Sequence, residues 1–145
     1  MAGGKATTFD NDLLKLIFNA TPIANIADNA ASAPLTNLYL SLHTADPGVG
    51  GSQTTNEATY TGYARVAVPR TSSGFTVAAG GATTLAANTN FPNPSGGSEV
   101  ETFFAVGTAS SGAGKILYRG PITPSISIVV GTPPQLTTGT TITES

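Results

Sequence analysis

The chain has 145 residues, about the length of one ordinary domain, and only 10% of them are charged. Six basic and eight acidic side chains give a net charge of −2, which excludes a strongly basic surface for nucleic acid. The absence of cysteine excludes disulfides and thiolate metal sites, and a single histidine excludes zinc sites built on several histidines. No apolar run is long enough to cross a bilayer, so no membrane partner is expected.

The composition favours short strands and turns over a helical bundle. The exposed faces of helices need Lys, Glu and Arg, which are scarce here, whereas Gly and Pro number 17 and 10. A small domain with so little surface charge is expected to be covered by copies of itself or by a large partner.

One amphipathic helix is predicted near the N-terminus, over residues 9–20. Asp10 is expected to cap the free N–H groups of its first turn, and Pro22 ends it. Its apolar side chains recur at helical spacing and share one face: Leu13, Leu14, Ile17 and Phe18.

The helix divides the chain into further parts. Residues 1–8 are predicted to be a flexible arm, and residues 21–36, rich in Ala, Asn and Pro, an extended connector. Residues 37–145 are predicted to form a single β domain, because no further boundary is visible in the composition.

Strands are predicted where apolar and polar residues alternate between turn signals, at intervals of roughly 10 to 15 residues. In the first of them, Leu38, Leu40 and Leu42 should face the core and the residues between them the polar side. This spacing favours an antiparallel β-sandwich, jelly-roll-like, over βαβ units. The tail after residue 136 either adds a last short strand or stays loose. The predicted strands are 38–43, 63–68, 75–87, 100–106, 115–119 and 126–130.

The run Gly107–Lys115 weakly resembles a phosphate-binding loop. Its register fails, because Ala109 stands where the first glycine is needed and Ile116 where a Ser or Thr is needed. We therefore expect a hairpin loop between two strands and no nucleotide site.

Polar residues near His43 raise two possible chemical roles, hydrolysis and calcium binding. Ser41, Asp46 and Glu57 could complete a hydrolytic set with it, but Ser41 and His43 share one strand face, which is poor geometry for a base and its nucleophile. We expect a surface or interface histidine instead. Asp46, Asn56 and Glu57 leave calcium binding as an alternative, although their spacing is not that of an EF-hand.

Other carboxylates and aromatic residues complete the candidates. Glu99 and Glu101 share a strand face beside a turn and are expected to be solvated. We assign no catalytic, cofactor-binding or metal-binding residues, and expect no enzymatic activity. Five aromatic residues either form subunit contacts or fill the second face of a sandwich: Tyr39, Tyr60, Tyr63, Phe103 and Tyr118.

Five segments of the chain are distinctive when taken together: LHTADPG at residues 42–48, TNE at 55–57, YTGYARV at 60–66, VGTASSGAG at 106–114 and LTTGT at 136–140. They resemble a family of small virion proteins of tailed bacteriophages. The similarity covers nearly the whole chain from the helix onward, and members are labelled tail-fibre or capsid decoration proteins. The resemblance implies a phage structural protein and transfers no catalytic residue.

From this resemblance we expect a capsid decoration (cement) protein. It would lie on the capsid exterior, bridge subunits of the major capsid protein as a homotrimer, and assemble in the host cytoplasm without binding nucleic acid or membrane. A threefold ring suits the symmetry of an icosahedral shell. The alternative is a tail-fibre or tail-tip component involved in host attachment.

Overall fold

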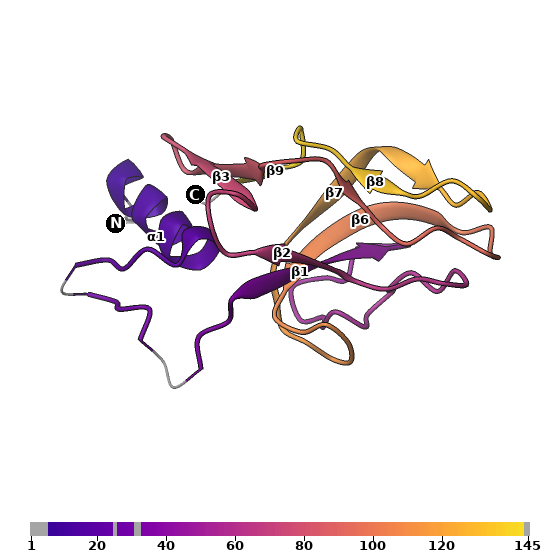
Figure 1. The fold of residues 1–145 in the computed structure, drawn as a ribbon, viewed down its shortest axis with the longest axis horizontal. Helices are drawn as coiled ribbons and strands as arrows, with labels where there is room; N and C mark the ends of the chain where they lie inside the picture. The colour runs from indigo at the N-terminus through magenta and orange to yellow at the C-terminus, as the bar shows by residue number, and fades with distance from the viewer. Residues whose placement is uncertain (1–5, 25, 31–32, 144–145) are drawn as a thin grey trace. The chain divides into compact units, whose positions relative to one another are not determined.

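A computed structural model of the chain describes residues 6–24, 26–30 and 33–143. The fold is mainly β and antiparallel, with the predicted N-terminal helix (Figure 1). The prediction of the fold class is confirmed, because the sheets are consistent with a β-sandwich and do not close into a barrel. Residues 1–5 of the expected arm lie outside the described residues.

The described residues form two compact units, which do not follow the order of the chain. Unit 1 draws on residues up to Thr36, on Pro69–Ala87 and on the residues from Thr137. Unit 2 draws on Asn37–Val68 and Asn88–Leu136. The segment that the sequence indicates as a single β domain therefore contributes strands to both units.

Unit 1 is a helix packed on a small sheet. Helix α1 (Thr7–Asn19) lies against β3 (Phe75–Ala78) and β4 (Ala82–Leu85), and β9 (Thr141–Thr143) completes the sheet in the order β3-β4-β9 (Figure 1). The tail thus adds a last short strand. The predicted strand 75–87 is a hairpin, because Gly80 and Gly81 take positive φ angles and reverse the chain.

The core of unit 1 centres on two aromatic rings. Phe18 and Phe75 are fully buried, with ring centroids 4.7 Å apart. Leu14 is fully buried on the same helix face, as its spacing predicts. Leu85 and Ile142 are buried in the sheet of the same unit.

The helix begins earlier than predicted, and Asp10 is not its cap. Ala6 is the N-cap residue, with extended backbone and no side-chain cap, and its carbonyl accepts the N–H groups of Phe9 and Asp10 at 2.9 and 3.0 Å. Asp10 lies within the first turn, where its charge still suits the positive end of the helix dipole. The helix ends at Asn19, before Ala20 in the left-handed region at φ 52°.

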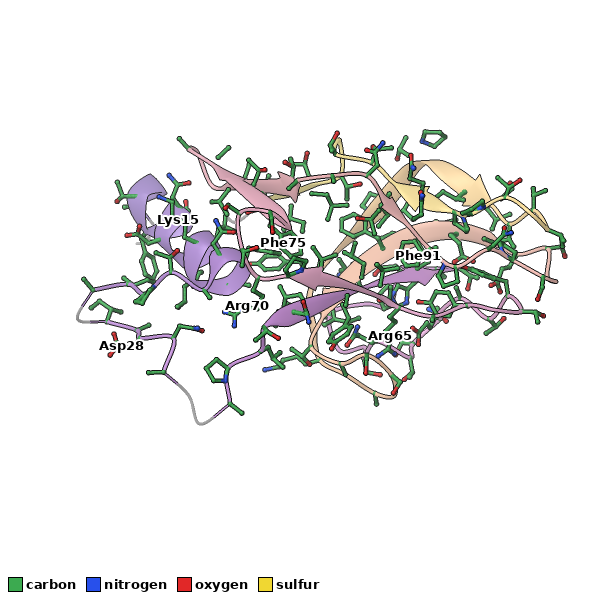
Figure 2. All side chains as sticks on the ribbon, in the orientation of Figure 1. Lys15, Asp28, Arg65, Arg70, Phe75 and Phe91 are labelled. Atoms are coloured by element: carbon green, nitrogen blue, oxygen red, sulfur yellow. The ribbon has the colours of Figure 1, made fainter. Side chains whose placement is uncertain are left out.

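Arg70 binds the other end of the helix (Figure 2). Its Nε and Nη2 donate to the carbonyls of Ile17 and Leu16, each at 2.7 Å. Its Nη1 donates to the carbonyl of Leu35 at 2.6 Å, and Nη2 also contacts Asn29 Oδ1 at 3.3 Å. The last carbonyls of a helix have no partner within it, so this guanidinium supplies the missing donors and ties the connector to the helix.

Unit 2 contains the larger sheet and a short two-stranded ribbon. The sheet has the order β2-β1-β6-β7, and β5 pairs with β8. The strands are β1 (Asn37–His43), β2 (Val66–Pro69), β5 (Thr89–Asn90), β6 (Val100–Gly107), β7 (Ile116–Ser127) and β8 (Gln135–Leu136).

Strand β7 replaces the two strands predicted over 115–119 and 126–130. It runs through Pro121 and Pro124 because it lies at the edge of the sheet, where a missing N–H can face away from the ladder. A register shift opposite the step from Glu101 to Phe103 takes up the extra residues of β7.

Strand β1 is buried on both faces, which the sequence does not predict. Leu38, Leu40 and Leu42 are at most 2% exposed, as expected for the core face. Ser41 and His43 on the opposite face are also fully buried. The polar alternation is misleading here because the chain after β1 folds back over that face.

We expect Arg70→Met to lower the free energy of unfolding of unit 1 by about 2 kcal/mol, because carbonyls at the helix end lose charged donors. Thermal unfolding followed by circular dichroism checks this. Lys15→Met is the matched control, since it removes an exposed cation of the same helix and should shift the melting temperature little. Equal shifts for the two variants would contradict the role given to Arg70.

Candidate functional site: a polar cluster beneath two loops

Two loops of unit 2 lie against each other below β1 in Figure 1. Loop A comprises residues 44–56 and follows β1, and loop B comprises residues 108–115 and joins β6 to β7. Ser52 and Lys115 form an antiparallel bridge, and the N–H of Gln53 donates to the carbonyl of Gly114 at 2.9 Å. Most of the segments that carry the phage resemblance lie in or beside these loops.

Arg65 is the centre of the polar cluster beneath the loops (Figure 2). Its Nε and Nη2 donate to the two carboxylate oxygens of Glu57 at 2.6 and 2.8 Å, and the side chains of Arg65 and Glu57 are 2% and 15% exposed. Its Nη1 and Nη2 also donate to the carbonyls of Ala109 and Gly112, at 3.0 and 2.7 Å. The hydrogen bond to Glu57 raises the pKa of Arg65, so the guanidinium stays charged.

Tyr63 extends this network to the sheet. Its hydroxyl donates to Glu57 Oε1 at 2.9 Å and accepts the N–H of Leu42 at 3.2 Å. Burial, followed by the charge of Glu57, raises the pKa of Tyr63 well above its usual range, so the phenol remains a donor. A continuous series of hydrogen bonds therefore connects the backbone of β1 with the backbone of loop B.

Gln53 fastens loop B from its other side. Its side chain is fully buried, and its Oε1 accepts the N–H of Ala109 at 3.0 Å. A Cβ at Gly107 or Gly114 would overlap the Gln53 side chain, so both positions require glycine. The glycines that weakly suggest a phosphate loop thus serve packing, and the predicted hairpin loop between two antiparallel strands is confirmed.

His43 is not the surface or interface residue that the sequence suggests. Its Nδ1 lies 2.9 Å from the carbonyl of Thr55, and its Nε2 lies 2.9 Å from Ser41 Oγ. The carbonyl can only accept, so Nδ1 carries the proton and Nε2 accepts the serine hydroxyl. Burial lowers the pKa of His43, which keeps the ring neutral at pH 7.

The structure separates the hydrolytic set considered from the sequence. Ser41 and His43 do meet, but a backbone carbonyl occupies the place of the carboxylate and both residues are sealed from solvent. Asp46 instead accepts the N–H of Gly48 at 2.8 Å and forms an ion pair with Arg119 at 2.5 Å. Because Glu57 is engaged by Arg65, no carboxylate orients the histidine.

The residues considered for calcium make contacts of their own. The amide of Asn56 donates to the backbone carbonyl of Asp46 at 3.1 Å, and Asn56 itself takes a left-handed backbone at φ 54°. Both carboxylates, Asp46 and Glu57, face an arginine. Within the described part of the chain, no three His, Cys, Asp or Glu side chains gather in a way that could hold a metal ion.

The aromatic candidates differ in burial. Tyr60 is 3% exposed and belongs to the core, and Tyr63 packs beside it at 5.3 Å between ring centroids and near Phe91 at 6.4 Å. Tyr39, Phe103 and Tyr118 are half-buried, and a role for them in subunit contacts stays a prediction. The expectation that Glu99 and Glu101 are solvated is wrong for Glu101, which is fully buried.

Sequence reasoning missed Gln53 and the pairing of Glu57 with Arg65. A signal was present, because a chain with so few charges places an acid and a base eight residues apart inside its most distinctive segments. Gln53 gives no comparable signal, since its role depends on the glycines of a distant loop.

The family model of the podophage GP4 fiber I protein gp80 matches residues 6–144. The chain belongs to this family. It is therefore a phage virion structural protein, as the resemblance implies. None of the curated proteins matches the chain. The helix of the described region is too short to span a membrane.

For this member of the gp80 family, we expect Arg65→Met to destabilise unit 2 by about 3–5 kcal/mol, because it leaves the largely buried Glu57 without its cation and with only the hydroxyl of Tyr63 as a side-chain donor. Arg119→Met is the matched control. Its partner Asp46 is 44% exposed, so the cost should be roughly 0–1 kcal/mol. Urea unfolding of both variants measures the difference. Comparable losses of unfolding free energy would show that the Arg65–Glu57 pair is no better shielded from solvent than the Arg119–Asp46 pair.

Proposed function

We propose that this chain is a structural component of the virion fibre, that it assembles with copies of itself as a homotrimer, and that it acts without catalytic turnover. The observation that carries the proposal is the match of a fibre-protein family over residues 6–144. The fibre role is the alternative that the sequence leaves open, and the word fiber in the description of the family supports it.

Most charged side chains of unit 2 have partners within the unit or are buried, which supports a role in assembly. Four of them form two acid–base pairs, Glu99 accepts hydrogen bonds from the backbone, and Glu101 is buried. Lys115 in loop B is the other charged residue of this unit. A surface of Thr, Ser, Gly and Val allows copies to approach one another without charge repulsion and makes their contacts insensitive to salt.

The polar cluster supports a mechanical role more than a chemical one. Its donors and acceptors are directed at backbone groups of loops A and B, and its one serine–histidine contact is closed to solvent. Loops fixed in this way present a constant shape to a neighbour or to a host surface, because little conformational entropy is lost on contact.

Capsid decoration is the second candidate. The neutral surface that suits a fibre also suits a clamp on the capsid exterior that bridges major capsid subunits. In both cases assembly would take place in the host cytoplasm, with neither nucleic acid nor membrane as a partner.

The position of the protein in the virion distinguishes these roles. We expect antibodies against it to label fibres in electron micrographs, and quantitative mass spectrometry to give a copy number far below that of the major capsid protein. Antibody label over the whole head surface, with a copy number comparable to that of the major capsid protein, would contradict the fibre role and support capsid decoration.

A further inference from the structure

Two glutamates at the start of β6 lie next to each other in unit 2. Glu99 Oε1 accepts the N–H groups of Thr59 and Tyr60, both at 2.6 Å, and Glu99 Oε2 accepts the hydroxyl of Thr59 at 2.8 Å. These are short, charge-assisted bonds of the kind that an ionised carboxylate makes. Glu99 therefore fastens the 59–60 segment to the start of β6.

Glu101 lies beside it in a different environment. Its side chain is fully buried, and both carboxyl oxygens lack a donor among the described residues. Glu99 stands two residues earlier in the extended chain, and its carboxylate is close enough to Glu101 for its charge to raise the pKa of that group. Two ionised carboxylates cannot bond each other, whereas a protonated Glu101 can donate its O–H to Glu99.

We propose that Glu99 and Glu101 form a proton-sharing carboxyl pair, a pH-sensitive clasp that holds the 59–60 segment on β6 and loosens in alkaline solution. When Glu101 is protonated, its buried hydroxyl has a hydrogen-bond partner in Glu99. The pair then carries a single negative charge on Glu99, which the N–H and hydroxyl donors of Thr59 and Tyr60 stabilise. Loss of the proton places a second negative charge on the fully buried Glu101, beside the half-buried Glu99, and no cation among the described residues acts on Glu101 to offset it.

The surroundings of the pair contain few other titratable groups. From the facing segment, Tyr60 is the one that interacts with it, and burial followed by Glu101 and Glu99 raises the pKa of Tyr60 to about 12. On β7 the cross-strand partner of Glu101 is the uncharged Ile126. On the β1 side, Thr44 contacts β6 through the hydroxyl of Thr102. Tyr60 therefore stays neutral throughout the range in which Glu101 titrates.

The direction of the pH effect follows from the two states of Glu101. Burial, and then the charge of Glu99, raises the pKa of Glu101 from 4.5 to about 8 in the folded protein. The folded state therefore holds a proton that the unfolded state releases near pH 4.5. The contribution of the clasp to stability is complete below pH 4.5 and is lost progressively as the pH rises toward 8.

The clasp is tested by urea unfolding of wild type and Glu101→Gln between pH 4 and 10. The glutamine amide imitates the protonated acid and can donate to Glu99 at every pH. We expect wild type to lose stability across this range and the variant to lose much less, so that the variant is the more stable of the two at pH 9. Asp12→Asn, which removes an exposed carboxylate of α1, should follow the wild-type profile.

Carboxyl NMR of the wild-type protein provides a second measurement that does not depend on a variant folding. We expect the Glu101 carboxyl to titrate with an apparent midpoint near 8, together with shifts of the amide signals of Thr59 and Tyr60. A Glu101 midpoint near 4.5, or parallel pH profiles for wild type and Glu101→Gln, would overturn the proposal.

Discussion

The ion pair between Arg65 and Glu57 is the constraint on which the organisation of unit 2 depends. A guanidinium that is 2% exposed must satisfy its donors internally, because the loss of hydration costs several kcal/mol per ion. Arg65 does so with a carboxylate and with two carbonyls of loop B. The requirement to pair one buried charge therefore determines where loop B lies, and Tyr63 transmits the same requirement to β1.

Much of the fold follows from local patterns that the sequence displays. The apolar face of α1, the leucines of β1 and the β6–loop B–β7 hairpin were predictable, because periodicity and turn residues act over short distances. The continuity of β7 through its prolines was not, since it depends on the strand lying at a sheet edge. The packing of residues 69–87 with the helix in one unit was not predictable either, because it depends on contacts between segments that are distant in the sequence, such as that of Phe18 with Phe75.

The site was less predictable than the fold. The sequence draws attention to His43, Asp46, Asn56 and Glu57 as alternatives for hydrolysis or calcium binding, but their partners are backbone groups and arginines that no spacing rule identifies. Burial decides the roles of His43 and Glu57. On an open cleft these two side chains would suggest catalysis, whereas beneath loops A and B they take part in hydrogen bonds that hold backbone in place.

We expect the polar cluster to fix loops A and B in the free protein. Amide hydrogen exchange of the wild-type chain tests this most directly at Thr108 and Ala109, whose N–H groups donate to Lys115 O and to Gln53 Oε1. These amides of loop B should exchange as slowly as the amides in the middle of β6, because both open only when unit 2 opens. Exchange at the rate of an unstructured peptide, while β6 stays protected, would contradict it.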